Sequence, residues 1–88
     1  MSGEMNRVTV EIFGQYYTIK GTSNAAHMRA VASFVDDKMI QMAKANPRLD
    51  TNKLAVLAAV NVADEFFKLR QEYEELIRLL EKNSLKKE

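Results

Sequence analysis

Hydrophobic and polar residues alternate along residues 7–13, a pattern typical of a strand with one buried face. Val8, Val10 and Ile12 fall on one side of this strand, and polar or charged residues fall between them. Residues 16–20 are rich in aromatic and β-branched residues, which favour a second strand. The pattern therefore predicts two strands that are close in sequence, each with one apolar face.

The two predicted strands are separated by Gly14 and Gln15. A two-residue turn with glycine in the first position is a common hairpin connection, so these residues predict a hairpin over residues 7–20. In this register Phe13 pairs with Tyr16, and the apolar residues of both strands share one face.

A cluster of turn-forming residues at 21–24 precedes a segment with helical periodicity, so a helix is predicted over residues 24–45. Asn46 and Pro47 end it, because the residue before a proline is excluded from the α region and proline cannot continue the hydrogen-bond ladder. The predicted apolar stripe of this helix consists of Met28, Val31, Val35, Met39 and Met42.

A second helix is predicted to begin with Asp50 or Thr51 as its N-cap residue and to continue over residues 53–82, which contain neither glycine nor proline. Thirty helical residues span about 45 Å, whereas a compact domain of this chain length is roughly 30 Å across. The helix is therefore expected to extend beyond its own domain.

The second helix carries a heptad pattern for nearly four repeats. Beyond residue 67 its other faces are charged, so only this stripe remains apolar there. Burying its last four large side chains is worth roughly 6 to 12 kcal/mol, and the rest of the chain is already committed elsewhere. We therefore expect homo-oligomerisation, with a dimer as the smallest assembly and a dimer of dimers as the larger alternative. The stripe, called the seam below, consists of Ala55, Ala59, Val62, Phe66, Leu69, Tyr73, Leu76 and Leu80.

The predicted fold class is α+β, with an N-terminal hairpin, a short helix and a long C-terminal helix that forms an intermolecular coiled coil. The 88 residues are expected to form one small domain. Its predicted parts are a flexible N-terminus at residues 1–6, a globular head at 7–67 in which the long helix starts at 51, a coiled-coil extension at 68–82 and a frayed tail at 83–88.

Composition and charge disfavour several function classes. The formal net charge is only +1 and cysteine is absent, which disfavours a dedicated nucleic-acid binder and removes disulfides and thiolate metal sites. No signal peptide or membrane span is predicted, so a cytoplasmic protein is expected. His27 has no co-ligands nearby, and Asp36 and Asp37 point about 100° apart and are interpreted as a solvated face. No enzyme, metal or cofactor is therefore expected.

Two short segments in this order and spacing, IFG at residues 12–14 and LAAVN at residues 57–61, resemble the ZapA family over residues 8–80. ZapA proteins are bacterial cell-division proteins that bind FtsZ, a tubulin-like GTPase that polymerises at the division site. The resemblance implies a head of hairpin and short helix, dimers paired through the long helix, and tetramers joined by the coiled-coil tails. This chain ends soon after Leu80, which shortens the tail relative to longer relatives and leaves dimer and tetramer as alternatives.

The resemblance also implies that the protein crosslinks and aligns FtsZ filaments at the division site. In the family, the surface that contacts filaments lies around the hairpin turn and the start of the long helix. Several longer relatives carry an acidic residue where this chain has Asn52 and Lys53, so the charge pattern of the contact does not carry over. By position, the candidate FtsZ contacts are Gln15, Arg48, Asn52, Lys53, Leu57 and Asn61.

Asn61 has two interpretations, because it lies between two valines in the most apolar stretch of the long helix. It is either a buried amide that fixes the register of a helix interface or a contact to FtsZ. A different function class also remains open for the whole chain. A strand followed by two helices in a dimer describes ribbon-helix-helix DNA-binding regulators, although this strand has its own hairpin partner and the second helix is much longer.

Overall fold

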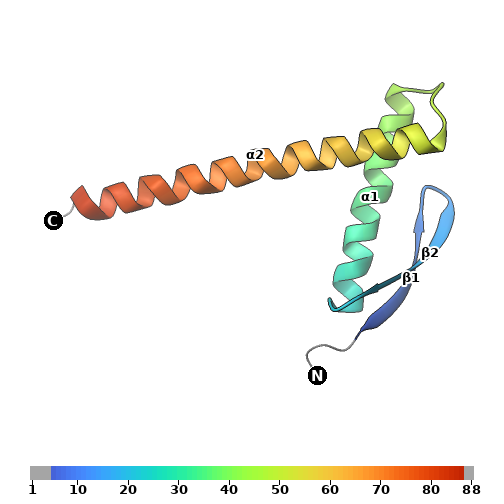
Figure 1. Cartoon of the computed structure of the whole chain (residues 1–88), viewed down its shortest axis with the longest axis horizontal. Coiled ribbons are helices and arrows are strands. Elements are labelled where there is room, and N and C mark those ends of the chain that lie inside the picture. The colour runs from blue at the N-terminus through green and yellow to red at the C-terminus, as the bar shows by residue number, and fades with distance from the viewer. Residues whose placement is uncertain (1–4, 87–88) are drawn as a thin grey trace. The chain divides into compact units, whose positions relative to one another are not determined.

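A computed structural model describes residues 5–86, with side-chain exposure described as far as residue 83. Two antiparallel strands precede two helices, which confirms the predicted fold class (Figure 1). The predicted flexible N-terminus lies largely at residues 1–4, outside the described part, and Asn6 already belongs to the first strand. The elements in chain order are β1 (Asn6–Ile12), β2 (Gln15–Gly21), α1 (Ala25–Ala45) and α2 (Thr51–Lys86).

The chain divides into two compact units, Met1–Ala58 and Ala59–Glu88. The first unit contains the hairpin, α1 and the first turns of α2, and the hydrophobic residues that are buried among those described all belong to it. The second unit consists of the rest of α2. The predicted boundary of the head at residue 67 concerns the assembled protein and stays a prediction.

The hairpin register differs from the predicted one. Ile12 pairs with Gln15, and Phe13 and Gly14 form the turn with φ values of 50° and 81°. The predicted pairing of Phe13 with Tyr16 is therefore wrong. Two positive φ values are the signature of a type I′ turn, whose twist matches that of the flanking strands. Because the two registers differ by two residues, the apolar residues keep their predicted face.

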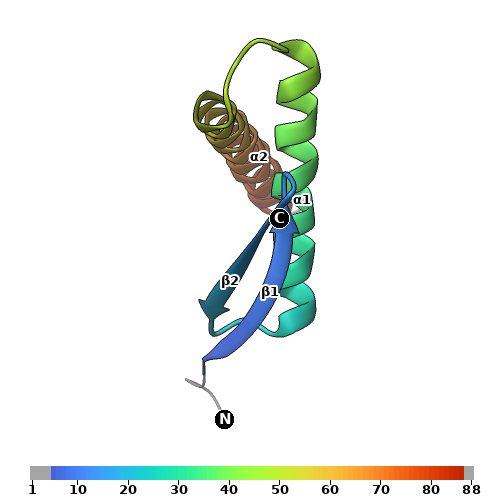
Figure 2. The same ribbon diagram turned by 90° about the vertical axis from the view of Figure 1, so that its right-hand side faces the viewer.

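The first core cluster lies between the hairpin and α1. Figure 2 shows β1, rather than β2, running along α1. Met28 and Ala32 of α1 are buried against Val8 and Val10 of β1, so these residues hold the sheet onto the helix. Ala32 takes the place predicted for Val31, which is exposed. A small side chain at this position allows β1 to approach the helix closely. The residue of the buried stripe that follows Met28 is therefore four positions later, at Ala32, and not three positions later.

The second core cluster joins α1 to the first turns of α2. Met39, Leu54 and Ala58 form its buried centre. Val35 and Met42 pack against this centre as the predicted stripe requires. The cluster lies within the first unit and fixes the helix–loop–helix connection across residues 46–50.

The N-terminal ends of both helices are capped by polar side chains, as predicted. The Asn24 side chain accepts a hydrogen bond of 2.7 Å from the backbone N–H of His27, and the Asp50 carboxylate accepts one of 2.9 Å from the backbone N–H of Lys53. Asp50 is therefore the N-cap residue of α2, which decides between the two predicted candidates. At its other end α2 runs to Lys86, past the predicted end near residue 82, because no helix breaker interrupts it. The predicted frayed tail is thus helical up to that residue, and residues 87–88 lie outside the described part.

We expect Asn24→Ala to lower the free energy of unfolding by about 1 kcal/mol, because it leaves an N-terminal backbone N–H of α1 without its acceptor. Urea denaturation at fixed protein concentration measures this loss. The matched control is Ser23→Ala, one residue earlier, which keeps the cap and should change the free energy by less than about 0.5 kcal/mol. Equal losses in the two variants would contradict the capping role.

Candidate self-association and partner-binding surfaces

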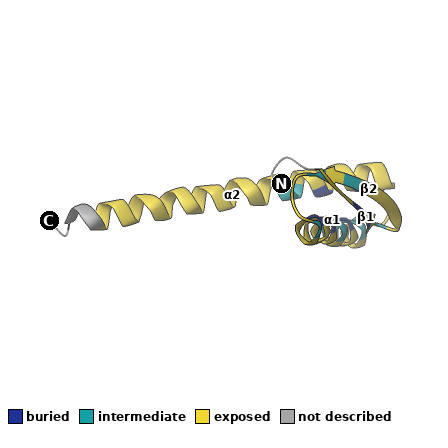
Figure 3. Ribbon diagram, turned by 90° about the horizontal axis from the view of Figure 1, so that it is seen from below, coloured by how far each residue is buried: buried dark blue, intermediate teal, exposed yellow. Residues whose placement is uncertain are grey.

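The seam lies exposed along the second unit. Among the described side chains of α2 from residue 66 onward, none is buried, as the exposed colour along this helix in Figure 3 shows. The five seam residues in this part are each between 53% and 65% exposed. They are Phe66, Leu69, Tyr73, Leu76 and Leu80. Val62 of the same unit is partly buried, and Ala55 and Ala59 are exposed.

The apolar surface widens toward the C-terminal end of α2. Ile77 and Leu79 lie at the e and g positions on either side of the seam, and both are exposed together with Leu76 and Leu80. A two-stranded coiled coil buries mainly the a and d positions, whereas its e and g positions are usually charged. Four adjacent apolar positions therefore form a face broader than one helix partner covers.

The flanks of the seam near residue 66 carry charged side chains. The Arg70 guanidinium lies over the ring of Phe66 at 5.6 Å and over that of Phe67 at 4.9 Å from the ring centroids. On the same helix, Lys68 forms an ion pair of 3.0 Å with Asp64, one turn before it. The hydrogen bond to the Asp64 carboxylate, together with its negative charge, raises the pKa of Lys68. Both groups of this pair are exposed, so the pair contributes little to stability and mainly marks this face as solvated.

The candidate contacts of the first unit lie on two segments that the core brings to the same side. Gln15 closes the hairpin turn opposite Ile12. Ile12 and Phe13 pack against the cluster that contains Leu54, so the hairpin turn lies beside the first turns of α2. The other candidates, which lie in the connection before α2 or in its first turns and are all exposed, are Arg48, Asn52, Lys53 and Leu57.

Asn61 belongs to the second unit and is partly buried. Its Oδ1 atom is buried and accepts no hydrogen bond from the described residues. An amide oxygen without a donor costs free energy, which a donor from a second copy, another protein or an ordered water would offset. Both interpretations of this residue therefore stay predictions.

Replacing Asn61 with leucine, which has a similar size, should leave the free energy of unfolding unchanged or raise it by up to about 1 kcal/mol, because the variant removes an unsatisfied oxygen. Urea denaturation of the two proteins at equal concentration tests this expectation. A loss larger than about 1 kcal/mol would mean that the oxygen has a donor in the assembled protein.

Asp36 is a residue whose role the sequence interpretation missed. Its carboxylate accepts a hydrogen bond of 2.7 Å from the backbone N–H of Phe13, the turn residue with positive φ. A left-handed conformation costs a residue with a Cβ about 1–2 kcal/mol, and a hydrogen bond to a charged group contributes about 1.5–3 kcal/mol, so the two offset each other. The predicted solvated role is therefore wrong for Asp36, whereas Asp37 is exposed as expected. Positive φ values are expected from sequence at glycine, asparagine or aspartate. Phe13 carries no such signal, so neither its turn conformation nor the role of Asp36 could be predicted.

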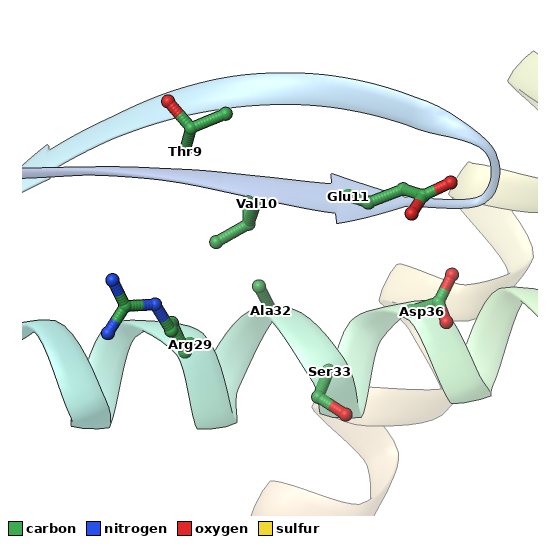
Figure 4. A pocket seen from close by; sticks show the side chains of 7 residues that line it. All are labelled: Thr9, Val10, Glu11, Arg29, Ala32, Ser33 and Asp36. Carbon is green, nitrogen blue, oxygen red and sulfur yellow. The ribbon is translucent and has the colours of Figure 1, made fainter.

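A small groove of about 260 Å³ lies between β1 and α1 in the first unit (Figure 4). Its lining is largely polar and carries both signs of charge, with Glu11 on the strand and Arg29 and Asp36 on the helix. Asp36 points toward the end of the hairpin in this view. The groove lacks the mostly apolar lining of a small-molecule site, and we assign it no ligand.

Among the described residues, no cluster of three or more histidine, cysteine or acidic side chains has metal-binding geometry. Over the same part of the chain, neither helix is long and apolar enough to cross a membrane. His27 lies exposed in the first turn of α1.

These features define a class of small α+β proteins in which a hairpin and a short helix pack on the start of a long helix with an exposed apolar seam. A family profile described as Cell division protein ZapA matches residues 8–87, so the chain belongs to the ZapA family of cell division proteins. A Cell division protein ZapA from Geobacillus thermodenitrificans is 59% identical over 70 residues, covering 80% of this chain and 77% of the relative. A Cell division protein ZapA from Bacillus pumilus is 56% identical over 81 residues, covering 91% of this chain and 95% of the relative.

Solved structures show the same fold. A ZapA mutant dimer from Geobacillus stearothermophilus matches with a TM-score of 0.70 and 50% identity, covering 89% of this chain and 91% of that one. A conserved bacterial protein of unknown function from Pseudomonas aeruginosa matches with a TM-score of 0.66 and 22% identity, covering 80% and 78%. The second match supports the fold alone.

Proposed function

We propose that this protein is a non-enzymatic adaptor that self-associates through the seam and crosslinks FtsZ filaments at the division site in the cytoplasm. The observation that carries the proposal is the run of half-exposed large apolar side chains along α2. Burying them against a second copy removes apolar surface from water at each of several successive turns. The adaptor needs no cofactor or metal, since its work is binding.

Self-association turns a weak contact into an effective crosslink. When one head of an assembled adaptor is bound, the effective concentration of the other heads near the filaments is high, so individually weak contacts suffice. A symmetric dimer presents two identical contact surfaces, which suits a partner that is itself a repeating polymer. The solved relative from Geobacillus stearothermophilus is a mutant dimer. For this chain, the broad apolar face around Ile77 and Leu79 additionally supports a dimer of dimers.

The proposed filament contact combines the hairpin turn with the start of α2. Gln15 next to the hairpin turn supplies an amide, and Lys53 and Leu57, one helical turn apart at the start of α2, supply a cation and an apolar side chain. Lys53 favours an acidic complement on the filament.

Leu76→Asp should weaken self-association at least a hundredfold, because it removes a buried leucine from each copy and places a carboxylate in the seam. Sedimentation equilibrium at several concentrations measures this change. Pelleting of the variant with assembled FtsZ, and light scattering of the mixture, should show reduced bundling.

Gln71→Asp is the matched control, because it introduces the same charge at an exposed position on the opposite side of α2 from the seam. It should self-associate and bundle like the parent. If Leu76→Asp bundles as well as the parent while remaining monomeric, crosslinking through self-association is wrong.

Leu57→Ala should weaken binding to FtsZ filaments by about tenfold without changing self-association, because it truncates an apolar contact at the proposed surface. Co-sedimentation over a range of filament concentrations gives the affinity, and sedimentation equilibrium gives the assembly state. Ile40→Ala is the control, since Ile40 of α1 is 38% exposed and Leu57 is 36% exposed. Equal affinities of the two variants would remove Leu57 from the contact.

The DNA-binding alternative receives no support from the family match or from the solved relatives. The structure also pairs β1 with β2 of the same chain.

A further inference from the structure

The hairpin sequence is compatible with two registers. In the observed register Phe13 and Gly14 form the turn, and Gln15 pairs with Ile12. In the alternative register Gly14 and Gln15 form the turn, and Phe13 pairs with Tyr16. The two differ by two residues, so Val8, Val10 and Ile12 keep the same face in both. Hydrophobic alternation therefore does not choose between them.

Turn preference alone favours the alternative register. A type II′ turn needs glycine only in its first central position, which Gly14 would supply. The observed type I′ turn instead places Phe13 at a φ of 50°, a conformation that phenylalanine rarely adopts. Interactions outside the hairpin must therefore select the observed register.

The backbone N–H of Phe13 provides this selection. In a two-residue hairpin the residues that flank the turn exchange backbone hydrogen bonds, so the alternative register would commit this N–H to Tyr16. In the observed register Phe13 is a turn residue, and its N–H is donated to the Asp36 carboxylate at 2.7 Å. The side chain of Phe13 adds to the effect by packing on the cluster of Met39, Leu54 and Ala58.

We propose that Asp36 is a positioning residue that selects the register of the β1–β2 hairpin and thereby places Gln15 on β2 instead of in the turn. The assignment of the register rests on the geometry of the hairpin alone. Its consequence for partner binding rests on the proposed function, in which Gln15 contacts the filament. Asp36 itself is only partly exposed, and its carboxylate acts through the backbone of Phe13.

Nuclear magnetic resonance distinguishes the registers directly. Non-hydrogen-bonded pairs bring their α-protons close together, which gives strong cross-strand Overhauser effects. The observed register predicts these effects between Thr9 and Thr18, whose hydroxyl oxygens are 3.4 Å apart, and between Glu11 and Tyr16. The alternative register predicts the marker pair Val10 and Ile19.

We expect Asp36→Ala to bring up the Val10–Ile19 effect and to weaken the Thr9–Thr18 effect. Asp36→Asn, which keeps an oxygen acceptor at the same place, should retain the Thr9–Thr18 effect alone. The exposed neighbour tests specificity, since Asp37→Ala should behave like the parent. If Asp36→Ala does not fold, Asp36→Glu, which displaces the carboxylate by one methylene, is examined by the same effects. If the variant that folds shows only the Thr9–Thr18 and Glu11–Tyr16 effects of the parent, the proposal is wrong.

Co-sedimentation with FtsZ filaments separates this inference from the proposed function. A shifted register with about tenfold weaker filament binding supports both. A shifted register with unchanged binding supports the role of Asp36 and refutes the contact by Gln15, as would unchanged binding of Gln15→Ala. Weaker binding of Asp36→Ala with the parental register overturns the register role.

Discussion

The exposed apolar seam of α2 is the constraint on which the proposed function depends. Large side chains such as Leu69, Tyr73 and Leu76 are half exposed or more, although they repeat with the spacing of a coiled coil. Water is a poor environment for a continuous stripe of this kind, and the cost falls when a second helix covers it. The periodicity of the helix thus favours assembly, and assembly would repeat the proposed binding surface once in each copy.

The small core of the first unit explains how a short chain brings the segments of the proposed binding surface together. Two clusters, centred on Ala32 and on Leu54, attach α1 to the hairpin and to the start of α2 respectively. The close approach at Ala32 and the packing of Phe13 place the hairpin turn beside the first turns of α2. The candidate contacts therefore come from segments far apart in sequence, and α1 with its packed clusters is the frame that unites them.

The side-chain hydrogen bonds of this molecule mainly fix local backbone conformations. Asn24 and Asp50 define where the helices begin, and Asp36 holds a turn conformation that its residues would otherwise avoid. The unpaired amide oxygen of Asn61 is the opposite case, since its donor is missing from the described residues. Each of these groups acts at one place, whereas the two apolar clusters form the buried core of the first unit.

The sequence by itself determined the elements, the end of α1 before Pro47 and the seam, because the periodicity of apolar residues and the position of helix breakers are local properties. It also predicted the face of the hairpin that is buried. The tertiary structure alone decided the hairpin register, the exchange of Val31 for Ala32 in the core and the role of Asp36. Alternation of apolar residues did not decide the register, because a shift of two residues preserves it. The contacts of Phe13 with Asp36 and with the cluster around Leu54 involve residues distant in sequence, and these exist only in the folded protein.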